Sequence, residues 1–161
     1  MAFKALTDSW AAYYSDHQMV SLAIRYLHIA ALMVGGGTAL AIDRVVLGTA
    51  RRDTDDRRHA AMQALAGSHS VVVPSLVIVT LSGVLMTAAD WDTFVASRLF
   101  WIKMGLFALL LVNGGLLVAA ERRYASGADV AKWRRVLAAS GASVVLWLVI
   151  LWIGEWLTVA A

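Results

Sequence analysis

Four ionisable side chains lie within or beside long apolar stretches of this sequence: His28, His69, Lys103 and Glu155. An ionisable group in a segment long enough to cross a membrane costs several kcal/mol at mid-depth, which favours a functional role. Imidazole is the commonest metal ligand among side chains. A lysine ammonium pairs with carboxylates or phosphates, and a glutamate supplies the opposite charge. These residue types predict a ligand, a cation and a carboxylate for one binding site.

The stretch RYLHIAALMVGGGTALAIDR, residues 25–44, places His28 about two turns inside an apolar segment. Helical spacing puts Arg25, His28, Gly35, Gly36 and Asp43 on one stripe, polar at both ends and small in the middle. We expect this stripe to face the interior of a helix bundle. The glycines allow a neighbouring helix to approach closely. Alternatively, they leave room for a flat cofactor just below an axial ligand, His28, and both interpretations stay open.

Lys103 and Glu155 lie at a depth similar to that of His28 on two other segments. Lys103 lies roughly 6–8 Å below the same membrane boundary, at about 1.5 Å per residue. Its side chain either snorkels to the surface or faces the bundle. Glu155 is one turn from the end of the last segment, so an interfacial position is the alternative for it. Together His28, Lys103 and Glu155 predict a site in the outer half of the bilayer.

His69 belongs to the opposite side of the membrane, where it is either a metal ligand or an interfacial histidine bonded to a loop. His28 and His69 differ by very roughly 18 Å along the membrane normal, so they cannot hold one iron from both sides. A single haem on His28 is the remaining haem arrangement. Its second ligand would be absent or weak, such as Met33, Met86 or Lys103.

These residues need helices to position them, and the composition supplies helices. The chain has 161 residues, of which 60% are hydrophobic. A soluble domain is about half apolar. Four apolar runs reach the ~20 residues that a helix needs to cross the hydrocarbon core. We therefore predict an all-α integral membrane protein, a single domain over 1–161 that forms a four-helix up-and-down bundle. The predicted spans are 20–42, 70–89, 99–120 and 136–158.

Basic residues predict the topology. Two loops, 43–63 and 121–135, carry most of the basic residues: Arg44, Arg51, Arg52, Arg57, Arg58, Arg122, Arg123, Lys132, Arg134 and Arg135. The positive-inside bias places both loops in the cytoplasm and both termini outside. The same bias accounts for the basic character of the chain, so no nucleic-acid partner is predicted. The first twenty residues form either a short helix on the outer surface or a flexible tail, and they lack the pattern of a signal peptide.

Three stretches resemble a group of four-helix bacterial membrane proteins that includes the copper-resistance protein D family and the four-helix protoporphyrinogen oxidase family. They are YLHIAALMVGGG, PSLVIVTLSGVLM and SRLFWIKMGLFALLLVNGGLLVAAERR. The resemblance covers roughly residues 20–158, although only LH and F-W-x-K are specific. It implies the bacterial inner membrane, His28 as a haem ligand and Lys103 as its functional partner. The glycine triplet and the arginine-rich first loop depart from the oxidase pattern.

The expected function is that of a haem b-binding membrane protein in electron transfer or porphyrin oxidation. Arg25, Gly35, Gly36 and Glu155 would complete the cofactor site around His28, and a membrane redox partner or a quinone would exchange electrons with it. Copper transport is one alternative, because methionine thioethers suit Cu(I). The other is an accessory subunit of a larger membrane complex. A homodimer through the glycine face would favour that third interpretation.

Overall fold

Every element in the described part of the chain is helical. The structure is a computed structural model that describes residues 2–51, 54–126 and 129–160. The elements, in chain order, are α1 (Ala2–Asp16), α2 (Gln18–Ala31), the π-helical turn η1 (Leu32–Gly36), α3 (Gly37–Gly48), the 3-10 turn η2 (Thr49–Arg51), α4 (Asp55–Ala89), α5 (Trp91–Ala96), α6 (Arg98–Ala125) and α7 (Val130–Ala160). The predicted fold class is confirmed.

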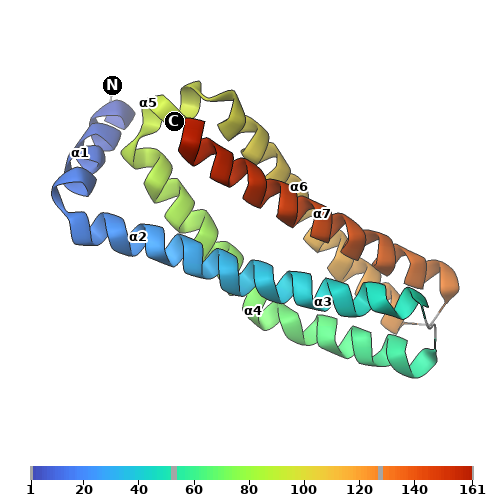
Figure 1. Cartoon of the computed structure of the whole chain (residues 1–161). Helices are drawn as coiled ribbons and strands as arrows, with labels where there is room; N and C mark the ends of the chain where they lie inside the picture. The colour runs from blue at the N-terminus through green and yellow to red at the C-terminus, as the bar shows by residue number, and fades with distance from the viewer. Residues whose placement is uncertain (1, 52–53, 127–128, 161) are drawn as a thin grey trace.

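Four helical segments are long and apolar enough to cross a membrane: Gln18–Gly48, Asp55–Ala89, Arg98–Ala125 and Val130–Leu157. The chain is therefore a multi-pass membrane protein. Both termini lie at one end of the bundle, here called the terminal end (Figure 1). The described parts of segments 43–63 and 121–135 lie at the other end, here called the basic end (Figure 1).

The helices extend further at the basic end than predicted. Helix α4 begins at Asp55, so the second half of the predicted loop 43–63 is helical. Ala61, Met62 and Leu65 of this extension are buried, while His59 on the same extension is exposed. The extension is thus amphipathic, and burial of its apolar side stabilises helix beyond the membrane-spanning run. Arg52 of the predicted loop lies outside the described residues.

The first span contains one feature that the sequence analysis did not predict. Between α2 and α3 the chain makes the π-helical turn Leu32–Gly36. Such wide turns are rare and occur often at functional sites. Here the turn begins four residues after His28 and includes the first two glycines of the triplet.

Two core clusters hold the helices together in the middle and at the basic end. The larger cluster includes Val46, Leu65, Tyr124, Trp133 and Val136, and the smaller one includes Ala39, Leu110, Leu146, Trp147 and Ile150. Towards the terminal end α2 packs with α4, and α6 packs with α7. In Figure 1 α4 runs from its contact with α2 to α5, which lies beside the terminal ends of α6 and α7. His28 and Lys103 belong to neither core cluster.

Helix α1 folds back against α4 and α5 at the terminal end (Figure 1). Trp10 Nε1 donates a hydrogen bond to the Leu85 carbonyl over 2.8 Å. The ring of Phe3 packs edge-on against Trp91 with the ring centroids 4.9 Å apart. Of the two alternatives for the N-terminal segment, the structure shows the helix. It covers the end of the bundle at which α2 and α4 meet.

Candidate functional site

His28 is held against α4 by its ring nitrogen Nδ1, which lies 2.9 Å from Ser82 Oγ. Ser82 Oγ itself donates to the Ile78 carbonyl over 2.6 Å. Its one hydroxyl proton is therefore committed, and it accepts the second bond from Nδ1–H. The Val79 carbonyl, another acceptor, also lies beside the ring. These neighbours place the imidazole proton on Nδ1 and leave a lone pair on Nε2.

Gly83 allows the imidazole to lie this close to α4. A Cβ atom at Gly83 would be 3.4 Å from His28 Cε1, at the limit of ordinary contact. Ser82 and Gly83 thus position the ring together. Ser82 bonds to it, and Gly83 leaves space for it because glycine has no side chain. Neither residue was predicted from the sequence, although a serine followed by a glycine within an apolar run indicates a position where a polar side chain from another helix can pack.

Lys103 of α6 approaches the same region from the other helix pair. Its Nζ atom would be 3.3 Å from a Cβ placed on Gly154 of α7, so its ammonium group lies against the α7 backbone. The side chain is half-buried, and its charge acts electrostatically on His28. No hydrogen bond or ion pair joins Lys103 to another residue within the described ranges. The structure therefore places the ammonium group of Lys103 where its charge acts on the imidazole of His28.

The other residues predicted for this site lie differently. Arg25 is exposed and bound to α1: its Nε donates to Tyr14 Oη over 3.2 Å, and its guanidinium carbon is 5.9 Å from the Tyr14 ring centre. Glu155 follows Gly154, but its side chain is exposed and is not buried with His28 and Lys103. Of the predicted three-residue site, the structure therefore relates His28 and Lys103 through the electrostatic effect of Lys103, and Glu155 is exposed.

Side chains of neighbouring helices occupy the space beside Gly35 and Gly36. A Cβ at Gly35 would lie 2.5 Å from Ser75 Cβ on α4, and one at Gly36 would lie 3.1 Å from the Trp147 ring on α7. Of the two interpretations of the glycine triplet, the structure shows close packing of helices. These two glycines leave no room for a macrocycle. Because the contacts are within the chain, the same surfaces are not open to a second copy.

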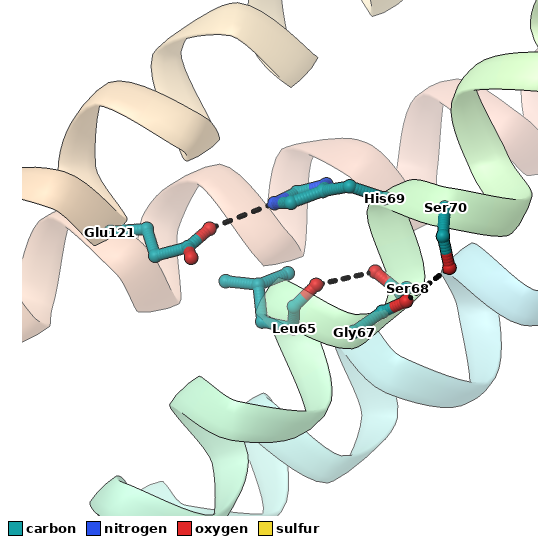
Figure 2. A network of polar contacts seen from close by, with 6 residues as sticks. All are labelled: Leu65, Gly67, Ser68, His69, Ser70 and Glu121. Atoms are coloured by element: carbon teal, nitrogen blue, oxygen red, sulfur yellow. Dashed lines mark hydrogen bonds and ion pairs between the residues drawn. The ribbon is translucent and has the colours of Figure 1, made fainter.

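His69 lies at the basic end, and its partner is on another helix rather than in a loop. Figure 2 shows its Nε2 facing Glu121 Oε2 of α6, at a distance of 2.8 Å. Ser68 and Ser70, on either side of His69, bond back to carbonyls of their own helix, those of Leu65 and Gly67. Sequence analysis assigned Glu121 to a basic loop and did not single it out.

The two histidines belong to separate sites. Ser82, which holds His28, is about 20 Å further along α4 than His69, at about 1.5 Å per residue. Around both histidines, the described residues hold no group of three or more His, Cys, Asp or Glu side chains that could bind a metal together. Met33 is 72% exposed, so it points away from the bundle and cannot join His28.

A cavity of about 560 Å³ separates α4 from α6. Its walls are largely apolar, with His69 near the basic end and Asp43 of α3 on its inner side. Asp43 is 2% exposed and lies beside Ser140 and Ser143 of α7. Its Oδ2 has no hydrogen-bond partner among the described residues. Sequence analysis placed Asp43 on the His28 stripe but gave it no role.

Comparisons with known proteins do not assign the chain to a family. No protein-family model matches the chain, and no curated protein or solved structure matches it either. The chain's assignment therefore rests on its own geometry: a helical multi-pass membrane protein with a histidine–lysine pair near its terminal end and a histidine–glutamate pair near its basic end.

Proposed function

We propose that this protein binds haem b through His28 near its terminal end and works in electron transfer or porphyrin oxidation. The observation that carries the proposal is the orientation of His28. Ligating histidines donate their second ring N–H to a protein acceptor, which fixes the tautomer and the ring plane. His28 makes that bond to Ser82, so Nε2 is the atom that would bind the iron.

Lys103 supplies the second supporting feature. An ammonium group that is half-buried in an apolar bundle is stabilised by an anion. Haem carries two propionates, and a charge-assisted bond from Lys103 would hold one of them. When bound, the haem would supply a one-electron couple whose potential depends on ligand identity, burial and nearby charge. The macrocycle would lie beside His28 and Lys103, rather than at Gly35 and Gly36, which are packed against Ser75 and Trp147.

The roles of this chain's own residues follow from that arrangement. Ser82 would hold the imidazole plane through the hydroxyl bond, and Gly83 would keep the ring close to α4. The positive charge of Lys103 would favour the more negative state of any bound redox group. A membrane quinone or a redox protein would exchange electrons with the site from the bilayer.

A titration with two porphyrins tests the role of Lys103. The purified apoprotein in mild detergent is titrated with haem and with its dimethyl ester, in which both propionates are uncharged. Replacing Lys103 by Met should weaken haem binding by roughly 10- to 150-fold and leave ester binding unchanged, since one charge-assisted bond contributes roughly 1.5–3 kcal/mol. Lys4→Met, on α1, is the control. Equal losses for haem and ester would contradict the pairing with a propionate.

We further propose the bacterial inner membrane, with the terminal end outside and the basic end in the cytoplasm. The basic residues at one end support this orientation. The chain has no cysteine, so single cysteines can report each end. Asp92→Cys, in α5, should react with an impermeant maleimide in intact cells, whereas Asp129→Cys should react only after lysis. The opposite pattern would reverse the topology.

A further inference from the structure

A second cavity lies between α6 and α7 at the basic end. Its volume is about 400 Å³. The residues that define this basic groove are Asn113, Ala119, Arg123, Lys132, Arg135 and Ala138. Three of them are basic, they come from two helices, and none of the residues that line the groove is acidic. This concentration of one charge in one hollow is what a bound anion requires.

The groove is basic only at its end. Below Arg123 and Lys132 its walls are small and apolar, with Ala119 on α6 and Ala138 on α7. Asn113 also lines the groove, and its Nδ2 donates to the Ala139 carbonyl over 3.0 Å. This amide donor is thus satisfied within the protein. The remaining surface suits a hydrocarbon chain.

The length of the groove matches one leaflet of a bilayer. Asn113 and Arg123 are separated by about 15 Å of helix at about 1.5 Å per residue. This distance is half of the ~30 Å hydrocarbon core. A ligand with its charged group at Arg123 would therefore have its chain end near the middle of the membrane.

The groove is independent of the cavity between α4 and α6. Gly114 and Val118 of α6 line that cavity, whereas Ala119 and Arg123 line the groove. At 3.6 residues per turn these two sets of positions lie on opposite faces of α6. The groove is also remote from His28 and Lys103, so the inference does not depend on haem binding.

We infer that the basic groove binds an anionic phospholipid, with its phosphate between Arg123, Lys132 and Arg135 and one acyl chain along Ala119 and Ala138. Basic pockets between membrane helices recognise anionic head groups in this way. A zwitterionic lipid has the same chains but no net charge, so it should bind less tightly. Inorganic phosphate has the charge but no chain, and it should bind weakly.

Native mass spectrometry of the delipidated protein in mild detergent tests the inference. The probes are palmitoyl-oleoyl phosphatidylglycerol, the corresponding phosphatidylcholine, and inorganic phosphate. The double variant Arg123→Gln/Arg135→Gln should bind phosphatidylglycerol about tenfold or more weakly, since each basic residue near a membrane surface contributes about 1 kcal/mol. Phosphatidylcholine binding should not change.

The matched control is Arg122→Gln/Arg134→Gln, which removes the same charge from the neighbouring exposed positions outside the groove. This control should retain native phosphatidylglycerol binding. An equal loss in both double variants would show general charge attraction and overturn the site. Equal binding of phosphatidylglycerol and phosphatidylcholine would also overturn the site, as would tight binding of inorganic phosphate alone.

A second variant keeps the charges and fills the groove. Ala138 is exposed in the groove, so Ala138→Leu adds volume there without entering the core. It should reduce phosphatidylglycerol binding several-fold, whereas Ala142→Leu, one turn further along α7, should not. If the arginine variants fail to fold, this pair decides: equal binding by Ala138→Leu and Ala142→Leu would overturn the proposal.

Discussion

His28 Nδ1 on α2 lies 2.9 Å from Ser82 Oγ on α4, and that hydroxyl already donates to the Ile78 carbonyl. The serine therefore accepts, the imidazole proton is on Nδ1, and the Nε2 lone pair is available. This one relationship fixes the orientation of the His28 ring, and the proposed role of His28 as a haem ligand depends on that orientation. It also ties the first span to the second, since His28 is on α2 and Ser82 is on α4.

Replacing Ser82 by Ala should release the imidazole ring without changing the volume of the core appreciably. Because acceptors of this kind set ligand orientation, iron-porphyrin affinity should fall by roughly 10–100-fold. Haem titration followed at the Soret band measures the change. Ser70→Ala, an exposed position on the same helix, is the control. Equal affinity in the two variants would show that the Ser82 bond does not position the ligand.

Gly35 and Gly37 make a matched pair, because a Cβ at Gly35 meets Ser75 at 2.5 Å whereas nothing lies within 4 Å of one at Gly37. Gly35→Ala should destabilise the protein by about 1–3 kcal/mol through overpacking. Gly37→Ala should be neutral or stabilise it by up to about 1 kcal/mol, as alanine favours helix. Thermal unfolding in detergent measures both.

The contact with Ser75 also predicts a rescue. Ser75→Gly removes the Cβ atom that the new methyl group meets, so Gly35→Ala/Ser75→Gly should be more stable than the sum of the single changes allows. Strictly additive effects would contradict the packing of α3 and η1 against α4 at this point.

His69 and Glu121 should be energetically coupled, because their side-chain atoms lie 2.8 Å apart and join α4 to α6 across the cavity. A double-mutant cycle with alanine at each position should give a coupling energy of roughly 1 kcal/mol. Unfolding in detergent supplies the four stabilities. A coupling energy of zero would mean that solvent or lipid satisfies each group separately, and that the pair does not close the basic end of the cavity.

Much of the fold was predictable because the bilayer allows few solutions. Four apolar runs are long enough to cross a bilayer, and in lipid such runs form helices. The spacing of His28, Gly35 and Asp43 predicted which face of the first span lies towards the other helices. The helical extension from Asp55 was not predicted, since its charges suggested a loop. Ala61 and Leu65 are buried and stabilise this helix by packing against other helices. The sequence alone does not show which helices those are.

The candidate site was predictable in part. His28 and Lys103 stood out because ionisable groups in spans are costly. Ser82, the partner of His28, and Glu121, the partner of His69, did not stand out, because each contact exists only once helices distant in sequence are placed side by side. Gly35 and Gly36 permitted two interpretations, and only the positions of Ser75 and Trp147 decide between them.

The central claim, that His28 is a haem ligand, is tested most directly by a reduced-minus-oxidised absorption spectrum of protein purified in mild detergent from haem-supplemented cells. The wild type should show a Soret shift with α and β bands near one haem per chain. His28→Ala should lose them, and His59→Ala, an exposed position on α4, should keep them. A featureless wild-type spectrum, or bands that survive in His28→Ala, would contradict the assignment.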